Sequence, residues 1–127
     1  MISCQGSSRL KSDERLVTII EKKMLTDDQN IDFSTIDLID WDGIMFFGPY
    51  SDLELFNSSS ELDLKNIEQN LIKHHDSFYL IVFLKNQKSV AIAEVSREFP
   101  DFENQLVVIK KEDALFYKQG DLFLLKN

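Results

Sequence analysis

Two histidines and an aspartate follow one another at His74-His75-Asp76, and side chains of these types can bind a metal ion. Metal sites on helices take ligands from positions three or four apart, which share a face, whereas adjacent residues point apart. The chain has one cysteine, Cys4, at its other end, so no zinc ligand set can be assembled. We therefore expect no metal site and no cofactor, and interpret the two imidazoles as favourable groups at a helix C-terminus.

Asp40 and Asp42 are the carboxylates most able to act together. On one strand they would share a face about 7 Å apart, where they could bind a cation weakly or raise one pKa. Such acids more often keep the edge of a sheet soluble. The glycines are scattered and form no phosphate loop, and no G-x-S-x-G motif is present. An enzyme that uses this acid pair is therefore the weakest hypothesis, and we expect no catalytic residues.

The composition limits the class of protein and its partners. The 127 residues suit one domain, which we place at 12–127 after a flexible lead over 1–11. The net charge is −8 and the isoelectric point about 4.7. A nucleic-acid partner requires clustered Lys and Arg, so we expect none. The negative charge fits a basic protein partner or, more simply, solubility.

The N-terminal residues Ile2-Ser3-Cys4-Gln5-Gly6 resemble the end of a bacterial lipoprotein signal peptide, in which the cysteine becomes lipidated. The apolar run that precedes such a cysteine is missing here. Two alternatives stay open: a lipid anchor at Cys4 on the cell envelope, with a start site upstream, or a cytoplasmic protein with an incidental cysteine. The sequence predicts no membrane span.

Helical spacing predicts two helices that could position these groups. The first begins at Ser12-Asp13-Glu14, with Ser12 as its cap, and ends before 26–30. Its apolar stripe consists of Leu16, Val17, Ile20 and Met24. The second helix runs from about 61 to 74, and a shorter helical segment can begin at 51–54.

Strand-forming residues dominate the rest of the chain. Residues 33–47 predict either one long strand with a kink at Gly43 or a hairpin at Asp42-Gly43. Strands at 78–84 and 90–95 are joined by a tight loop, and others are expected at 106–109, 114–117 and 122–125, with 99–102 as a loop. The predicted fold class is α+β, an antiparallel meander of about five strands with two helices packed on one face.

The loop at 85–88 also predicts the register of the first hairpin. It sets Val82 opposite Ala91 and Leu80 opposite Ala93. Because alanines leave a shallow strip beside larger side chains, we expect a helix to lie on their face of the sheet.

One segment resembles a group of small bacterial lipoprotein-like proteins to which no activity is attached. The shared pattern, W-D-x-x-x-x-F-G-P-Y-[ST], is met here by Trp41-Asp42 and 47–51, and an apolar hairpin ending in K-x-x-K follows over 80–88. The similarity covers about 35–95 and implies no catalytic residue. It favours a continuous strand through Gly43, where that group often has a larger residue, and it strengthens the lipid anchor at Cys4.

The candidates for binding a partner are Trp41, Asp42, Tyr50 and Arg97. Trp and Tyr dominate the energetics of interfaces, although both are also common at the rim of a core. Arg97 follows a strand directly and could contact an anion or form a surface ion pair. The first hypothesis is a non-enzymatic binding or accessory domain, which a lipid at Cys4 would anchor. The second is a cytoplasmic acidic immunity-type protein that neutralises a basic toxin.

Overall fold

The described residues, 9–26, 30–68 and 70–126 of the computed structural model, form two α-helices and two four-stranded sheets. The α+β class and its antiparallel character are confirmed. The strands are divided between two sheets, however, and do not form a single meander of about five strands.

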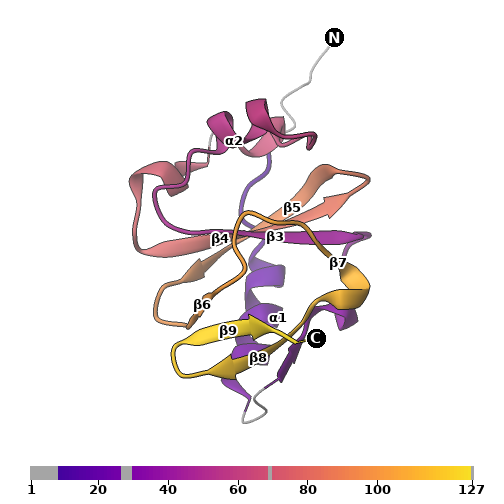
Figure 1. Cartoon of the computed structure of the whole chain (residues 1–127), viewed down its shortest axis with the longest axis vertical. Coiled ribbons are helices and arrows are strands. Elements are labelled where there is room, and N and C mark those ends of the chain that lie inside the picture. Colours follow the sequence, from indigo (N-terminus) through magenta and orange to yellow (C-terminus); the bar gives the residue numbers. More distant parts are fainter. Residues whose placement is uncertain (1–8, 27–29, 69, 127) are drawn as a thin grey trace.

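The first sheet is antiparallel throughout and crosses the middle of the molecule (Figure 1). In order across the sheet, its strands are β5 (Lys88–Ser96), β4 (Phe78–Lys85), β3 (Gly43–Phe47) and β7 (Ile109–Lys110). Six successive residues of β4 and all five of β3 are buried, so both faces of the sheet are covered. The expectation of a central apolar strand at 78–84 is confirmed.

The second sheet is smaller and holds the C-terminal hairpin. Its order is β2 (Asn30–Asp32), β8 (Leu115–Gln119), β9 (Leu122–Leu125) and β6 (Asp101–Phe102). The predicted hairpin of β8 and β9 is confirmed, and Gly120 in its turn has a φ of 63°. β6 runs parallel to β9 in the segment that the sequence predicted as a loop.

Each face of the first sheet has its own apolar core. One core lies between the sheet, α1 (Glu14–Leu25) and the second sheet. The other lies under α2 (Leu53–Ser59) and two short 3-10 turns, η2 (Lys65–Ile67) and η3 (Leu71–His74). The helices α1 and α2 therefore cover opposite faces (Figure 1), whereas the sequence predicted the helix after Ser12 and a helix over 61–74 on one face.

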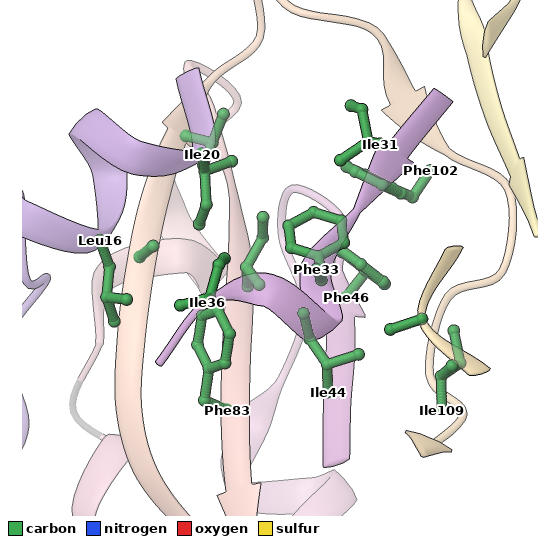
Figure 2. Packing of buried hydrophobic residues seen from close by; sticks show 14 of the residues in the cluster. Leu16, Ile20, Ile31, Phe33, Ile36, Ile44, Phe46, Phe83, Phe102 and Ile109 are labelled. Atoms are coloured by element: carbon green, nitrogen blue, oxygen red, sulfur yellow. The ribbon is translucent and has the colours of Figure 1, made fainter. Parts of the chain in front are cut away.

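Aromatic rings fill the core between the two sheets (Figure 2). Phe46 stacks on Phe102 with ring centroids 4.0 Å apart, and both rings meet Phe116 edge-on. The next residue along β3, Phe47, packs on the α2 side, because successive side chains of a strand point to opposite faces. Six of the ten phenylalanines of the sequence are buried in the core that joins the two sheets: Phe33, Phe46, Phe83, Phe102, Phe116 and Phe123.

Helix α1 is capped by Asp13, whose carboxylate accepts a hydrogen bond from the Arg15 N–H at 2.9 Å, and not by Ser12 as predicted. Ser12 instead accepts a hydrogen bond from the Glu94 N–H, while the Asp13 N–H donates to the Ile92 carbonyl. These bonds attach the start of the helix to the outer edge of β5, which would otherwise present unpaired backbone groups.

The predicted helix over 61–74 is wrong, since the segment contains only the 3-10 turns η2 and η3. Its backbone groups are engaged elsewhere: the Asp63 N–H donates to Gln87, and the Asp63 carbonyl accepts from Ser89. A residue that pairs with a strand in this way cannot also complete a helical turn. Leu64 and Ile67 are nevertheless buried against the sheet, so the apolar pattern predicted correctly which side chains are buried.

A β-bulge near Val90 shifts the register of the first hairpin by one residue. Ala91 lies opposite Phe83 and Ala93 opposite Ile81, not opposite Val82 and Leu80 as the turn length predicted. The two alanines do lie in the core that α1 covers, as expected. The bulge pairs the alanines with Phe83 and Ile81, whose side chains lie in the same core.

Residues 33–47 follow neither predicted alternative. The segment starts with the 3-10 turn η1 (Phe33–Thr35), and β3 begins only at Gly43. A side chain at Gly43 would meet Val108 Cγ1 at 3.1 Å, so the small residue permits a close approach of the neighbouring segment. The strand expected at 106–109 is reduced to β7, which the 3-10 turn η4 (Lys111–Asp113) follows.

Candidate functional site

Trp41 is a core residue. Its side chain is 2 % exposed, and the indole N–H donates to the Ile36 carbonyl at 2.8 Å. The ring meets Phe83 edge-on at 5.0 Å, and the Lys111 ammonium lies 5.1 Å from its centroid. This corrects the expectation that Trp41 contacts a partner, because its polar atom and its ring faces are already used within the fold.

Asp40 and Asp42 hold the β4–β5 hairpin. The Asp42 carboxylate accepts a hydrogen bond from the Asn86 N–H at 3.0 Å, and Asp40 forms an ion pair with Lys85 at 3.2 Å. Asn86 and Gln87 have φ values of 51° and 68°, the left-handed pair that a tight hairpin turn requires. The two acids thus contact adjacent residues where β4 enters its hairpin turn, Lys85 and Asn86.

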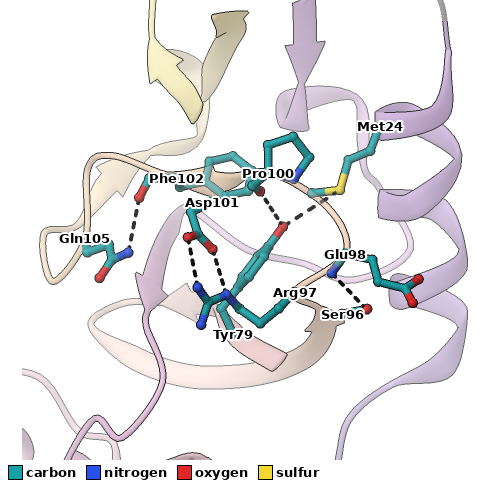
Figure 3. A network of polar contacts seen from close by, with 9 residues as sticks. All are labelled: Met24, Tyr79, Ser96, Arg97, Glu98, Pro100, Asp101, Phe102 and Gln105. Atoms are coloured by element: carbon teal, nitrogen blue, oxygen red, sulfur yellow. Dashed lines mark hydrogen bonds and ion pairs between the residues drawn. The ribbon is translucent and has the colours of Figure 1, made fainter. Parts of the chain in front are cut away.

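Arg97 pairs with Asp101 at the junction between the two sheets (Figure 3). Its guanidinium lies 3.2 Å from Asp101 Oδ1 and 3.4 Å from Oδ2. Asp101 Oδ1 is buried and accepts no hydrogen bond within the described part of the chain, so the ion pair is what compensates its burial. Of the two alternatives for Arg97, the structure shows the ion pair.

Tyr79 lies beside this pair and is also structural. The phenol donates to the Pro100 carbonyl at 3.1 Å and contacts Met24 Sδ at 3.8 Å (Figure 3). Burial raises the pKa of the Tyr79 phenol above its ordinary value, and the negative charges of Asp101 and Glu21 act in the same direction. The hydroxyl therefore stays protonated and joins β4, α1 and the loop before β6.

The remaining chemical candidates do not converge. His74 and His75 are exposed, and the His75 ring lies 5.8 Å from Phe78. Among residues 9–26, 30–68 and 70–126, no three His, Cys, Asp or Glu side chains are grouped so that they could hold a metal ion. Cys4 and the lipid anchor predicted on it lie outside the described residues.

Among the predicted contact residues, Tyr50 is the one whose large apolar side chain is exposed. It is 60 % exposed, and its φ of 63° is left-handed, a conformation that bulky residues adopt at a cost. The Tyr50 N–H donates to the Ile72 carbonyl at 2.8 Å, which holds the turn after β3 in place. The left-handed residue of this turn is Tyr50 and not Gly48.

A second exposed apolar segment runs beside β3, from Leu106 next to Phe46 to Val108 next to Gly43. Leu106, Val107 and Val108 are each close to half exposed, and Leu106 has a φ of 64°. The Leu106 N–H donates to the Phe46 carbonyl at 3.0 Å, so the segment is fixed beside the strand. The sequence did not reveal Leu106–Val108 as an exposed site, because a short apolar run predicts a buried strand.

Gly48 connects the two exposed segments. A Cβ atom at this position would lie 2.9 Å from Gln105 Oε1, so the turn that carries Tyr50 passes directly against the residue before Leu106. Gln105 is itself held by a hydrogen bond from its amide to the Phe102 carbonyl. We call Tyr50 and Leu106–Val108 together the β3-end surface; it starts at the end of β3 with Tyr50 and Leu106 and reaches Gly43 at Val108.

Charge is distributed unevenly along the chain. Residues 24–64 contain ten Asp and Glu and not one Lys, Arg or His. Their exposed members among the described residues include Asp37, Asp42, Glu54, Glu61 and Asp63. The segment that leads into and out of the turn of Tyr50 is therefore strongly negative.

None of the helices in the described ranges combines the length and the hydropathy needed to cross a bilayer. Comparisons of the chain with family models, with curated proteins and with solved structures find no match.

Proposed function

We propose that this chain is a non-enzymatic binding domain whose partner protein contacts the β3-end surface, Tyr50 and Leu106–Val108. The observation that carries the proposal is that two bulky residues, Tyr50 and Leu106, are both exposed and both left-handed at one end of β3. A left-handed backbone costs a non-glycine residue about 1–2 kcal/mol. Tyr50 remains 60 % exposed and Leu106 48 % exposed, so both leave apolar surface for a partner to bury. Strain of this kind concentrates at functional sites.

Aromatic and aliphatic side chains on fixed backbone suit protein recognition. A tyrosine offers a large contact area at a small loss of side-chain entropy. The hydrogen bonds to Ile72 and Phe46 hold both segments in place before a partner binds, which lowers the entropic cost of association. The negative charge of 24–64 supports a partner with a basic surface.

Glycine substitutions test the proposal without disturbing the fold, because glycine adopts a positive φ freely. The double variant Tyr50→Gly, Leu106→Gly removes both side chains. A partner recovered on the native protein from an extract of the source cells, then purified, is expected to bind the double variant at least about tenfold more weakly in calorimetry. The matched control is Leu25→Ser, an exposed leucine at the end of α1, which should bind as the native protein does. Equal affinity of the native protein and the double variant would contradict the proposal.

An acidic immunity-type protein that neutralises a basic toxin is the second candidate function. The ten acids of 24–64 favour it, because a toxin with a basic substrate-binding surface would be masked by such a charge. Under this candidate, the recovered partner is an enzyme, and a stoichiometric amount of this chain abolishes its activity. An active partner in the saturated complex would exclude it.

A lipid at Cys4 on a bacterial envelope is the last part of the proposal. The resemblance of residues 2–6 to the end of a lipoprotein signal peptide supports it. Cells that express the full gene are labelled with a radioactive fatty acid; the native protein should carry the label and Cys4→Ser should not. Absence of the label from the native protein would contradict a lipid anchor at Cys4.

A further inference from the structure

We infer that the outer face of α2 binds a basic segment of the partner protein, one that presents an apolar side chain flanked by Lys or Arg. This inference rests on the proposed binding function and names the chemistry of the partner. The binding face consists of Asp52, Glu54, Leu55 and Ser58, which surround a shallow depression of about 290 Å³.

Leu55 is the apolar centre of this face. It is 66 % exposed, while its neighbour Leu53 is buried in the core on the other side of the helix. Phe56 packs edge-on against Phe47 of β3 at 5.4 Å, so α2 is fixed to the sheet and its outer face keeps one orientation. A helix this short would not be stable alone, and its packing rather than its own propensity holds Leu55 outward.

Acids flank the apolar centre, and the sequence from 24 to 64 contains no Lys, Arg or His. Glu54 is exposed beside Leu55, and the Asp52 carboxylate, which caps the helix by accepting the Leu55 N–H at 3.0 Å, lines the same depression. Ser58 also lines the depression, and its hydroxyl donates a hydrogen bond to the Leu55 carbonyl. An apolar centre within a negative rim is complementary to an apolar side chain between two cations.

The charge also decides between two occupants of this face. A second copy of the chain would bring the same acids against it, and like charges in close contact cost several kcal/mol across an interface. A basic segment of another protein gains from the same field. The turn of Tyr50 leads directly into the Asp52 cap, so one partner can cover the β3-end surface and α2 together.

The inference can be tested with two synthetic peptides that share one length. The first has leucine between pairs of lysines, and the second has glutamate in place of each lysine. In ¹⁵N-resolved NMR titrations of the full chain, the lysine peptide should shift the amide signals of 50–58, and the glutamate peptide should shift none. Leu55→Ser should weaken binding of the lysine peptide at least about fivefold, as expected for loss of a central apolar contact.

Leu38→Ser is the matched control, because Leu38 is also an exposed leucine with acids beside it, Asp37 and Asp40. It should bind the lysine peptide as the native chain does. Equal losses for Leu55→Ser and Leu38→Ser would show attraction to negative charge in general and overturn the inference. So would a dimer of the native chain in sedimentation that Leu55→Ser dissociates, since the occupant would then be a second copy.

Failure of this inference can be distinguished from failure of the proposed function. If the purified partner loses affinity for the Tyr50→Gly, Leu106→Gly variant and not for Leu55→Ser, the binding function stands and the inference about α2 fails. If no partner distinguishes the double variant from the native chain, the function itself fails, whatever the lysine peptide does.

Discussion

The carboxylate of Asp42 accepts a hydrogen bond from the backbone N–H of Asn86, 44 positions further along the chain. The bond attaches the start of β3 to the turn between β4 and β5. Replacing Asp42 by Ala should lower the free energy of unfolding by about 1 kcal/mol, since a hydrogen bond to a charged acceptor is lost. Urea unfolding measures the change as a lower midpoint with an unchanged slope.

Asp40→Ala is the control for this change. Asp40 is strongly exposed, and a surface ion pair such as Asp40–Lys85 contributes little to stability. The free energy of unfolding should therefore fall by less than about 0.5 kcal/mol. Losses of equal size in the two variants would show that Asp42 acts through its charge and not through the bond to Asn86.

The turn itself can be improved at Gln87. Its φ of 68° strains a residue with a side chain, whereas glycine after asparagine is the favoured pair for this kind of turn. Gln87→Gly should raise the free energy of unfolding by about 0.5 kcal/mol. Glycine relieves the strain in the folded state, and the greater entropy that it gives the unfolded chain offsets part of this gain. Thermal unfolding followed by circular dichroism gives the sign. Gln87→Ala keeps the strain and should give no gain.

Trp41→Phe should destabilise the fold by about 2–3 kcal/mol, because the buried Ile36 carbonyl loses its donor and the core loses volume. Far-ultraviolet circular dichroism in urea measures this variant, which has no tryptophan left to report by fluorescence. Lys111→Met removes only the cation near the ring and should cost no more than about 1 kcal/mol. A larger loss for Lys111→Met than for Trp41→Phe would contradict a core role for the indole.

Arg97→Met should lower stability by about 1–2 kcal/mol, because the buried Asp101 Oδ1 loses the charge that compensates it. Both side chains of the pair are about one third exposed, so the estimate is already reduced for screening by solvent. Asp101→Asn added to Arg97→Met should recover part of the loss, since no buried charge is then left. A double-mutant cycle that shows no coupling would mean that the two side chains act independently.

Tyr79 should make stability fall at alkaline pH. Because the pKa of its phenol is raised by burial in the folded state, the unfolded chain loses this proton first, near its ordinary value of about 10. Above that pH the unfolded state binds fewer protons than the folded state, and the free energy of unfolding therefore decreases as pH rises. Below pH about 10, the Tyr79 phenol is protonated in both states and its contribution to the free energy of unfolding is fully present. Tyr79→Phe should weaken this decrease in urea titrations between neutral and strongly alkaline pH, and an unchanged slope would contradict it.

Several features of the fold could be read from local residues. The amphipathic stripe with Leu16 and Ile20 predicted α1, and the unbroken apolar run of 78–84 predicted a strand with both faces covered. The hairpin of β8 and β9 followed from alternating apolar residues around Gly120. Such patterns succeed because burial along one element depends mainly on the spacing of its own apolar side chains.

Other features depended on contacts between distant segments. The residues of 61–67 form no α-helix, because the edge of β5 takes the backbone groups of Asp63. The strand expected from 106 does not start there, because Leu106 has a left-handed backbone. The one-residue bulge near Val90 appears only in the pairing of β4 with β5, and the turn length predicted a different register.

The same division holds for the candidate site. Residue types and charge alone determined that the chain is acidic, that it lacks a set of zinc ligands, and that Tyr50 deserved testing as a contact. Only the tertiary structure decided that Trp41 is enclosed, that Arg97 is paired with Asp101, and that Leu106 and Leu55 face outward. The reason is physical: exposure of a side chain is settled by which other segment packs over it, and that segment is chosen by the whole fold.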